Sequence, residues 1–489
     1  MDLIECNATS LLAKIQQGEA TPVDILEVCL DRIDAIDAKL HAFTVVERES
    51  ARLAAQEIGQ KINNGEPVGP LAGLPLAVKD CINVKGSQTA CGSKMLEGYL
   101  PPYDATVIER LVRQAGAIVI GRTNMDEFAM GSSTESSYFG PTFNPWDLTR
   151  VPGGSSGGSG AAVASCEVPV ALGSDTGGSI RCPAAYCGIS GIKGTYGRVS
   201  RYGLVAYANS LEQIGSLARS VEDCALLLSI MAGHDPRDST SAEVPVPDYT
   251  KLLDEDLSSI VIGVPTEFFG SGLNAEVETA VRNGIGVLEQ LGAQVQEVSL
   301  PHIEYALPTY YLIAMSECSS NLARFDGLRY GYRTDDNEKM NVTESFSKTR
   351  REGFGPEVRR RIILGTYALS AGFYDMFYIK ALKVRTLIKN DFQDALKTCN
   401  VLVGPTMPST AFEIGTKVDD PLQMYLEDVL TVPINLAGVP SLSVPCGFDS
   451  ANLPIGMQVM GRFYDEETVL KVGYAFQQRT EYHKQRPEI

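Results

Sequence analysis

The clearest hydrophobic pattern near the start of the chain is helical. In TPVDILEVCLDRIDAIDAKLHAF, which begins at Thr21, apolar residues recur every three or four positions and lie on one helical face. Thr21, a following proline and then Asp24 form a typical helix start, because the threonine caps free backbone N–H groups and the acid bonds back to the cap. The segment therefore predicts an amphipathic helix that packs against a core.

Further along, one order of patterns recurs: an amphipathic helix, a glycine and a short apolar strand. DATVIERLVRQAGAIVIG predicts a helix capped by Asp104 and stopped at Gly116, with a strand over 117–120. The same order is found in NAEVETAVRNGIGVLEQLGAQVQEVSL, where Gly292 is the stop, and in RTLIKNDFQDALKTCNVLVGP. LPLAVKDCINV, SLSVPCGF and PIGMQVMG read as further strands. This order predicts an α/β fold with a sheet covered by helices on both faces.

Two other regions bear on the domain organisation. SECSSNLARFDGLRYGYR and GPEVRRRIILGTYALSAGFYDMFYIKALKVR are aromatic-rich and have a helical pattern. HDPRDSTSAEVPVPDYT, residues 234–250, is polar and proline-rich, so it is either a linker between domains or a long surface excursion within one domain.

Composition and charge narrow the function. The 489 residues are 44% hydrophobic and 21% charged, as in globular proteins, and the formal net charge of -18 argues against direct, extensive nucleic-acid binding. The start of the chain is acidic and polar, and no apolar run reaches the length of a membrane span, which predicts a cytoplasmic protein without a membrane partner. The eleven cysteines include no C-x-x-C pair, so neither a disulfide framework nor a metal site is expected.

The tract VPGGSSGGSG, residues 151–160, is the first candidate for chemistry. A linker is disfavoured because the tract is short and is followed at once by buried-type sequence, and a phosphate-binding loop is disfavoured because no Lys-Ser/Thr pair closes it. It contains G-x-S-x-G, the nucleophile elbow of α/β hydrolases, but that motif needs a histidine base. In such a protein the histidine follows the serine, and His234, His302 and His483, the three of the four histidines that do so, lie in surface-like sequence. A serine enzyme of this kind would need a different base, and lysine is the recognised substitute.

Two further stretches provide a base and an anion site. GLPLAVKD places Lys79 at the end of an apolar run, where desolvation would lower the pKa of its ammonium; a lysine paired with Asp80 is the alternative. GSDTGGSIRCPAA places Ser179 after Thr176, Gly177 and Gly178, whose backbone N–H groups could converge on an oxyanion. A simple glycine turn between two core elements remains open for the second stretch.

Together, GLPLAVKD, GGSSGGSGAAVA, GSDTGGSIRCPAA and GIKGTYGRVSRYGL resemble the amidase signature family. The resemblance implies a single domain over residues 1–489 with a central mixed β-sheet covered by helices on both faces. It also implies a catalytic core over about residues 70–230 and a helical substrate-pocket region over about residues 300–400. It assigns Lys79 as the base and Ser179 as the nucleophile, with an oxyanion hole at Thr176, Gly177 and Gly178. Ser155, after a cis peptide bond, would relay the proton; its spacing to Ser179 fits better than that of Ser156.

Within the family, the second half of the chain resembles the glutamine-hydrolysing A subunits of tRNA-dependent amidotransferases. That resemblance implies a heterotrimer with B and C subunits, in which the B subunit uses ATP and Mg²⁺ and contacts charged tRNA, while this chain needs no cofactor. It implies that Arg361 binds the glutamine carboxylate, Asp428 the ammonium, and Tyr310 closes the pocket. The neighbouring Arg359, Arg360, Glu427 and Tyr311 leave a one-residue shift open. A stand-alone amidase and a catalytically silent scaffold protein remain the alternative functions.

Overall fold

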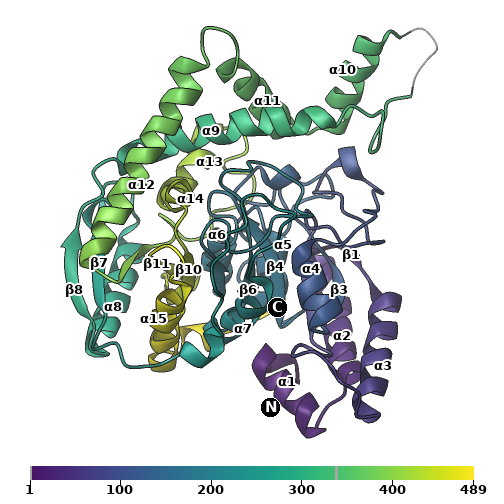
Figure 1. Cartoon of the computed structure of the whole chain (residues 1–489), viewed down its shortest axis with the longest axis vertical. Helices are drawn as coiled ribbons and strands as arrows, with labels where there is room; N and C mark the ends of the chain where they lie inside the picture. Colours follow the sequence, from purple (N-terminus) through teal and green to yellow (C-terminus); the bar gives the residue numbers. More distant parts are fainter. Residues whose placement is uncertain (1–2, 336–339) are drawn as a thin grey trace.

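The computed structural model describes residues 3–335 and 340–489 and contains one mixed sheet of 11 strands (Figure 1). The three strands β3, β2 and β4 are parallel, as are β9, β7 and β8, whereas the strands between these groups pair antiparallel. In sheet order the strands are β1 (Phe43–Val46), β3 (Ile118–Thr123), β2 (Pro75–Lys79), β4 (Val170–Asp175), β6 (Gln213–Ala218), β5 (Ser190–Lys193), β10 (Ser441–Phe448), β11 (Pro454–Gly461), β9 (Val401–Pro405), β7 (Val261–Pro265) and β8 (Gln294–Val298).

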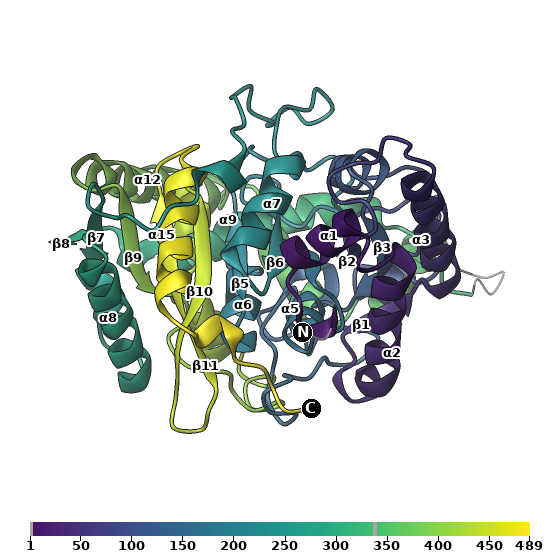
Figure 2. The ribbon, with the colours of Figure 1, turned by 90° about the horizontal axis from the view of Figure 1, so that it is seen from below.

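Helices cover both faces of this sheet, as the sequence predicts. A Cβ on Gly456 would meet Ala185 of α6 (Arg181–Cys187), whereas the next residue, Met457, lies against Gly284 of α8 (Ala275–Gln290). Because adjacent strand residues point to opposite faces, α6 and α8 lie on opposite sides of the sheet. With α6 lie α2 (Pro22–Leu40) and α5 (Gly157–Ala164); with α8 lie α7 (Val221–Met231) and α15 (Glu466–Arg479) (Figure 2).

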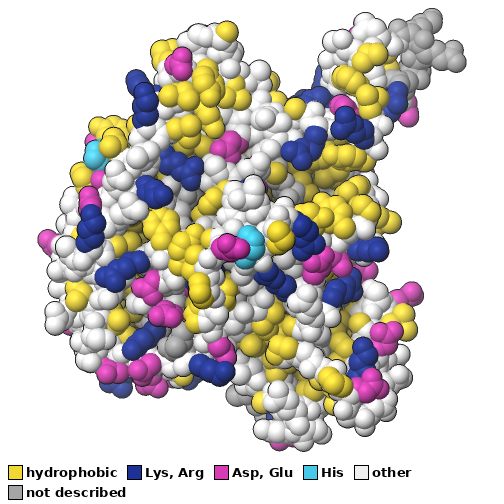
Figure 3. Space-filling view, viewed as in Figure 1, with side chains coloured by type: hydrophobic (Ala, Val, Ile, Leu, Met, Phe, Trp, Pro, Cys, Tyr) yellow, Lys and Arg dark blue, Asp and Glu magenta, His cyan; other side chains and the backbone are white. Residues whose placement is uncertain are grey.

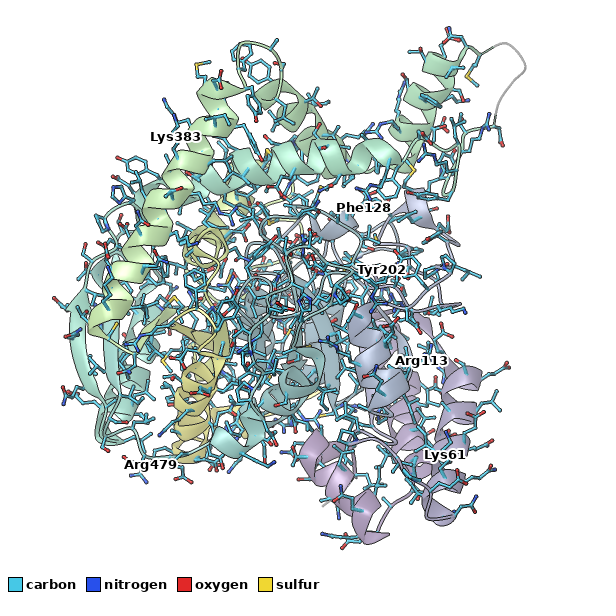
Figure 4. The ribbon with its side chains drawn as sticks, viewed as in Figure 1. Lys61, Arg113, Phe128, Tyr202, Lys383 and Arg479 are labelled. Atoms are coloured by element: carbon cyan, nitrogen blue, oxygen red, sulfur yellow. The ribbon has the colours of Figure 1, made fainter. Side chains whose placement is uncertain are left out.

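A layer of helices crosses one end of the sheet, at the top of Figure 1. Phe128, which is labelled in Figure 4, packs against Phe325 and Phe354 at the base of this layer, with ring centroids 5.0 and 5.7 Å away. Apolar side chains are also visible on the outer surface of the layer (Figure 3). The layer consists of α9 (Ala306–Asn321), α10 (Val342–Gly353) and α11 (Pro356–Ala368), with α13 (Pro421–Leu426) and α14 (Val432–Ala437) beneath it, and α12 (Lys380–Thr398) runs down from it beside β7.

The remaining helices lie at the edges and in connections. Near the start of the chain are η1 (Leu3–Glu5), α1 (Ala8–Gln17) and α3 (Arg48–Asn63). Short turns of helix in the connections are η2 (Lys94–Leu96), η4 (Glu127–Ala129), η5 (Tyr249–Leu252), η6 (Thr266–Phe269), η7 (Ile303–Tyr305), η8 (Leu322–Arg324), η9 (Asp375–Ile379), η10 (Glu427–Leu430) and η11 (Tyr482–Lys484). Across the described residues, no helix is long and apolar enough to cross a membrane.

Several predicted elements are confirmed. The capping box of Thr21 and Asp24 is present, Gly292 adopts φ +102° after α8, and SLSVPCGF and PIGMQVMG form β10 and β11 over their whole lengths. The polar segment 234–250 follows α7 and runs into η5, and the chain on both sides of it contributes strands to the same sheet.

Two predictions about helix ends are wrong. Asp104 does not cap the helix after it, which begins beyond Ala105 as α4 (Thr106–Ile108) and continues as the π-helical η3 (Glu109–Gln114). The Asp104 carboxylate instead accepts from the Lys85 N–H at 2.7 Å and pairs with Arg113 at 2.9 Å, so tertiary contacts outweigh the local cap (Figure 4 labels Arg113). The helix predicted around SECSSNLARFDGLRYGYR ends at Asn321 and a short turn, and the residues beyond Arg324 are not helical.

Candidate active site

Lys79 and Ser155 meet in the interior, at the end of strand β2. The Lys79 ammonium donates to Ser155 Oγ at 2.7 Å and to Ser174 Oγ at 2.9 Å, and both Lys79 and Ser155 are fully buried. The peptide bond between Gly154 and Ser155 is cis, as predicted. Burial lowers the pKa of Lys79 from its ordinary value of 10.5, which makes the neutral amine more accessible as a base.

The two neighbouring serines of the tract have different surroundings. Ser156 Oγ donates to the Ser174 carbonyl at 3.2 Å and accepts from the Ser174 N–H at 3.3 Å, so it ties the tract to the end of β4. Ser155 alone reaches the lysine. The geometry therefore favours Ser155 over Ser156 as the residue that exchanges a proton with Lys79.

Ser179 lies beside this pair, two residues before the start of α6. Its carbonyl accepts from the Ser156 N–H at 3.2 Å, which joins the two serine loops. Its side chain is 7% exposed, and its hydroxyl forms no hydrogen bond with any residue that the structure describes. Ser179 is thus held by its backbone while its oxygen is left for a substrate.

The loop before Ser179 is fixed by Asp175. This carboxylate accepts from the Gly178 and Ile180 N–H groups, at 3.0 and 3.1 Å, and forms a two-point ion pair with Arg181. Burial opposes the ionisation of Asp175, but the Arg181 guanidinium outweighs burial and holds the pKa of the carboxyl well below its usual range. The aspartate is therefore a permanent anchor for the loop.

This anchor changes the expected oxyanion hole. The Gly178 N–H is committed to Asp175, whereas the N–H groups of Thr176, Gly177 and Ser179 have no acceptor within residues 3–335 and 340–489. Gly178 is needed for another reason: its φ is +130°, and a Cβ there would lie 2.4 Å from Thr431 Oγ1. The loop therefore offers an oxyanion the N–H groups of Thr176, Gly177 and Ser179, and not that of Gly178, which the resemblance implied.

Arg361 is buried on α11, 3% exposed, while its neighbour Arg360 is exposed. Its Nε donates to Glu357 Oε1 and its Nη1 to the Tyr207 hydroxyl, both at 2.7 Å. The rings of Tyr311 and Tyr425 lie 5.3 Å from the guanidinium carbon. Its remaining N–H groups have no protein acceptor among the described residues, so they are available to an anion.

Asp428 accepts from Ser132 Oγ at 2.6 Å and from the Tyr311 hydroxyl at 2.7 Å. Burial raises the pKa of Asp428 to about 6. The adjacent Glu427 differs, because it forms an ion pair with Lys417 and accepts from the Tyr186 hydroxyl at 2.7 Å. Asp428, which forms no ion pair within the described chain, is thus the carboxylate better suited to a substrate ammonium.

Tyr310 and the Asp428 segment both contact the oxyanion loop. A Cβ on Gly177 would lie 2.5 Å from the Tyr310 hydroxyl, and Thr431 Oγ1 donates to the Gly177 carbonyl at 2.6 Å. The predicted pocket residues are therefore brought next to the predicted catalytic loop, from segments far apart in the chain.

Some residues of the site were not predicted from the sequence. Ser174, the second partner of Lys79, directly precedes Asp175 at the end of a strand. This position next to the glycine loop could have marked it as a candidate site residue. Asp126 accepts from the N–H groups of Thr134 and Ser136, and its own N–H donates to the Ser155 carbonyl at 3.3 Å. Nothing in its local sequence marks this role. Within the described residues, no group of three or more His, Cys, Asp or Glu side chains could hold a metal ion.

The fold, the lysine–serine pair and the anchored glycine loop are the features expected of a serine amidase. A comparison with sequence models of protein families agrees, because the amidase family matches residues 24–470. The chain belongs to that family, as the resemblance predicted. It is 57% identical to the A subunit of the glutamyl-tRNA(Gln) amidotransferase of Carboxydothermus hydrogenoformans, over 489 residues and 100% of both chains. It is 55% identical to the protein of the same name from Geobacillus thermodenitrificans, again over 100% of both chains.

Solved structures agree with this assignment. The crystal structure of the glutamyl-tRNA(Gln) amidotransferase A subunit from Thermotoga maritima superposes with a TM-score of 0.83 at 39% identity, covering 100% of this chain and 99% of that one. A peptide amidase in complex with the inhibitor chymostatin superposes with a TM-score of 0.86 at 31% identity, covering 99% of both chains. The central mixed sheet covered by helices is thus the fold of this family.

Proposed function

We propose that this chain hydrolyses glutamine and supplies the ammonia with which a tRNA-dependent amidotransferase converts Glu-tRNA(Gln) to Gln-tRNA(Gln). The observation that carries the proposal is that a buried cation, Arg361, and a buried carboxylate, Asp428, both lie near the Ser179 loop without being paired to each other in the described structure. Glutamine needs a cation for its α-carboxylate and an anion for its α-ammonium, in addition to a nucleophile at its amide. The full-length relatives that carry the name of the amidotransferase A subunit support the same assignment.

In the first step, the neutral Lys79 amine takes the proton of Ser155 while Ser155 takes the proton of Ser179. Ser179 Oγ then attacks the side-chain carbonyl of glutamine. The short contact of Lys79 with Ser155 and the lowered pKa of Lys79 support this direction of transfer. The oxyanion is held by the N–H groups of Thr176, Gly177 and Ser179, because that of Gly178 is engaged by Asp175.

The tetrahedral intermediate then collapses. The C–N bond breaks, the proton returns through Ser155 to the leaving nitrogen, and ammonia departs, leaving a glutamyl ester on Ser179. Water attacks this ester with the same base, and glutamate is released. Arg361, Asp428 and Tyr310 hold the amino-acid end of the substrate throughout, so the amide carbon is kept at Ser179.

The relatives' name implies a multi-subunit enzyme, and we propose a heterotrimer with B and C subunits that acts as a glutamine-hydrolysing ligase. In this scheme ATP and Mg²⁺ act on the B subunit, which also provides most tRNA contacts. The net charge of -18 supports leaving the tRNA to a partner. The cytoplasm is the proposed compartment, in keeping with cysteines among which no disulfide is formed in the described chain.

The test is to measure glutamine hydrolysis by the chain alone and then with B and C subunits, charged tRNA and ATP. We expect strong stimulation on assembly and formation of Gln-tRNA(Gln). Strong hydrolysis of small amides by the isolated chain, without dependence on partners, would instead identify a stand-alone amidase. Failure of a serine-directed amide trap to label Ser179 in the active complex would favour a silent scaffold.

A further inference from the structure

Thr431 lies in the segment that carries Asp428, yet its side chain contacts the oxyanion loop. It is fully buried, and its Oγ1 donates to the Gly177 carbonyl at 2.6 Å. Its own N–H donates to the Asp428 carbonyl at 3.0 Å. One residue thus contacts both the ammonium end of the predicted pocket and the loop before Ser179.

The peptide unit between Gly177 and Gly178 is bound at both ends. Its carbonyl accepts from Thr431, and its N–H, which belongs to Gly178, donates to Asp175 at 3.0 Å. The carbonyl and the N–H point in opposite directions because the peptide bond is planar and trans. The two contacts together therefore fix the plane of this peptide unit.

Hydrogen bonds are needed here because the glycines on either side leave the peptide unit free to rotate. Larger residues are excluded at both positions. A Cβ on Gly177 would lie 2.5 Å from the Tyr310 hydroxyl, and a Cβ on Gly178 would lie 2.4 Å from Thr431 Oγ1. The loop therefore depends on Thr431 and Asp175 for its conformation.

The N–H groups on either side of this peptide unit are two of those expected to hold the oxyanion. They belong to Gly177 and Ser179 and have no acceptor anywhere in the described chain. Rotation of the peptide unit would turn them away from a common point. Donors stabilise an oxyanion best when they are aligned before the reaction, so the orientation of this unit bears directly on the rate.

Thr431 is itself held in place. Its carbonyl accepts from Arg181 Nη2 at 3.1 Å, and the same guanidinium forms the ion pair with Asp175. The two side chains that bind the peptide unit are therefore joined through Arg181, and the contacts close into a ring.

We propose that Thr431 is a positioning residue, whose hydroxyl aligns the N–H groups of Gly177 and Ser179 toward the oxyanion. This inference rests on the proposed glutaminase function. Thr431 does not contact the substrate in this scheme and acts through the Gly177 carbonyl. Its loss therefore weakens the binding of the transition state and leaves the binding of the amino-acid end of glutamine intact.

The test uses Thr431→Val in the assembled complex, because valine has nearly the shape of threonine but cannot donate a hydrogen bond. We expect kcat for glutamine hydrolysis to fall about 10- to 100-fold and the KM to change less than about 2-fold. Thr431→Ser keeps the hydroxyl, so its kcat should recover to within about 3-fold of the wild-type value.

A glutamine analogue with a boronic acid in place of the amide probes the oxyanion loop directly. Ser179 Oγ adds to the boron and its proton passes to Ser155, which gives a tetrahedral anion. The affinity for this analogue should fall about 10- to 100-fold in Thr431→Val. The affinity for glutamate, measured by calorimetry, should stay unchanged, whereas a general distortion of the site would weaken both.

Thr142→Val is the matched control. Thr142 is also fully buried, and its hydroxyl also donates to a backbone carbonyl, that of His41, at 2.7 Å. Because Thr142 lies outside the catalytic loop and the glutamine pocket, its substitution should leave kcat and KM within about 2-fold of the wild-type values.

The outcomes separate this inference from the proposed function. A raised KM with unchanged kcat in Thr431→Val would show that Thr431 supports Asp428 instead, and would overturn the inference alone. A kcat in Thr431→Ser as low as that in Thr431→Val, or an equal loss in Thr142→Val, would overturn it as well. Absence of glutamine turnover by the wild-type complex would overturn the proposed function and this inference with it.

Discussion

The catalytic centre and the glutamine pocket adjoin each other but are built in opposite ways. The centre comes mostly from one stretch of chain, from the end of β2 to the start of α6, and its main groups stand at strand ends. The pocket is assembled from distant segments: Ser132 and Asp428, which are hydrogen-bonded, lie 296 positions apart, and Arg361 and Tyr207 lie 154 apart.

The two regions also hold their key groups differently. In the centre, backbone groups and the Asp175 carboxylate fix the loops and leave the Ser179 hydroxyl and three N–H groups without partners within the described residues. In the pocket, side chains fix one another, so that Arg361 and Asp428 each have two hydrogen-bonded neighbours. Changes in the first region should therefore reduce kcat, and changes in the second should raise KM.

The largest effect is expected for Ser179→Ala. Because the nucleophile is removed, glutamine hydrolysis in the complex should fall by about 10⁴-fold or more. Binding of glutamine, measured by calorimetry, should persist, since the pocket is untouched. Near-normal turnover would disprove the assignment of Ser179.

The next largest effect separates the two serines of the glycine tract. Ser155→Ala removes the only one of the two that reaches Lys79, so kcat should fall by about 10²- to 10⁴-fold. Ser156→Ala removes a hydroxyl that bonds to the Ser174 backbone, so its effect on kcat should be smaller. Steady-state kinetics of both variants check this order, and a larger loss in Ser156→Ala would reverse the assignment.

The pH profile tests the base. Lys79 acts when neutral, so kcat/KM should rise with pH through its pKa, and burial moves that rise below pH 10.5. Lys79→Arg keeps a cation but provides no base at accessible pH, and it should abolish the rise together with the activity. A rising limb that survives in Lys79→Arg would assign the base to another group.

The same contrast governs what the sequence could predict. Lys79, Ser155 and Ser179 stand in short motifs whose residue order carries the chemistry, and the structure brings Lys79 and Ser155 into contact. Arg361 and Asp428 were assigned only by resemblance. Tyr207 and Glu357, which hold Arg361, and Ser132, which holds Asp428, were not predicted. Contacts across such long separations leave no local pattern, because they depend on how helices pack over the sheet end.

The fold shows a similar division. Strands β10 and β11 and the helix start at Thr21 followed from periodicity and capping. No helix was predicted within the tract 151–160, but its last four residues begin α5, although three of them are glycines. A Cβ on Gly158 would lie 2.4 Å from the Ala42 carbonyl, so close packing rather than helix propensity selects glycine there. Prediction from local sequence therefore fails at positions where tertiary contacts determine the residue.

In the pocket, the larger effect is expected for Asp428→Asn. It removes the charge that faces the substrate ammonium, so the KM for glutamine should rise about 10- to 100-fold with kcat little changed. In the wild type, the KM should also rise as the pH falls through about 6, because protonation neutralises Asp428 while the substrate ammonium stays charged. An unchanged KM in Asp428→Asn would show that the pocket is wrongly assigned.

The smallest effect is expected where a residue acts through another. Glu357 receives the Arg361 Nε and the Tyr425 hydroxyl on one oxygen, so Glu357→Gln should loosen the guanidinium without removing it. The KM for glutamine should rise about 3- to 10-fold and kcat should stay constant, since the reacting atoms are not involved. Arg359→Ala, which changes a neighbouring arginine outside this cluster, is the matched control and should leave KM unchanged. If Arg359→Ala raised KM and Glu357→Gln did not, the α-carboxylate of glutamine would be bound by Arg359. The pocket would then have to be assigned to a different set of α11 residues.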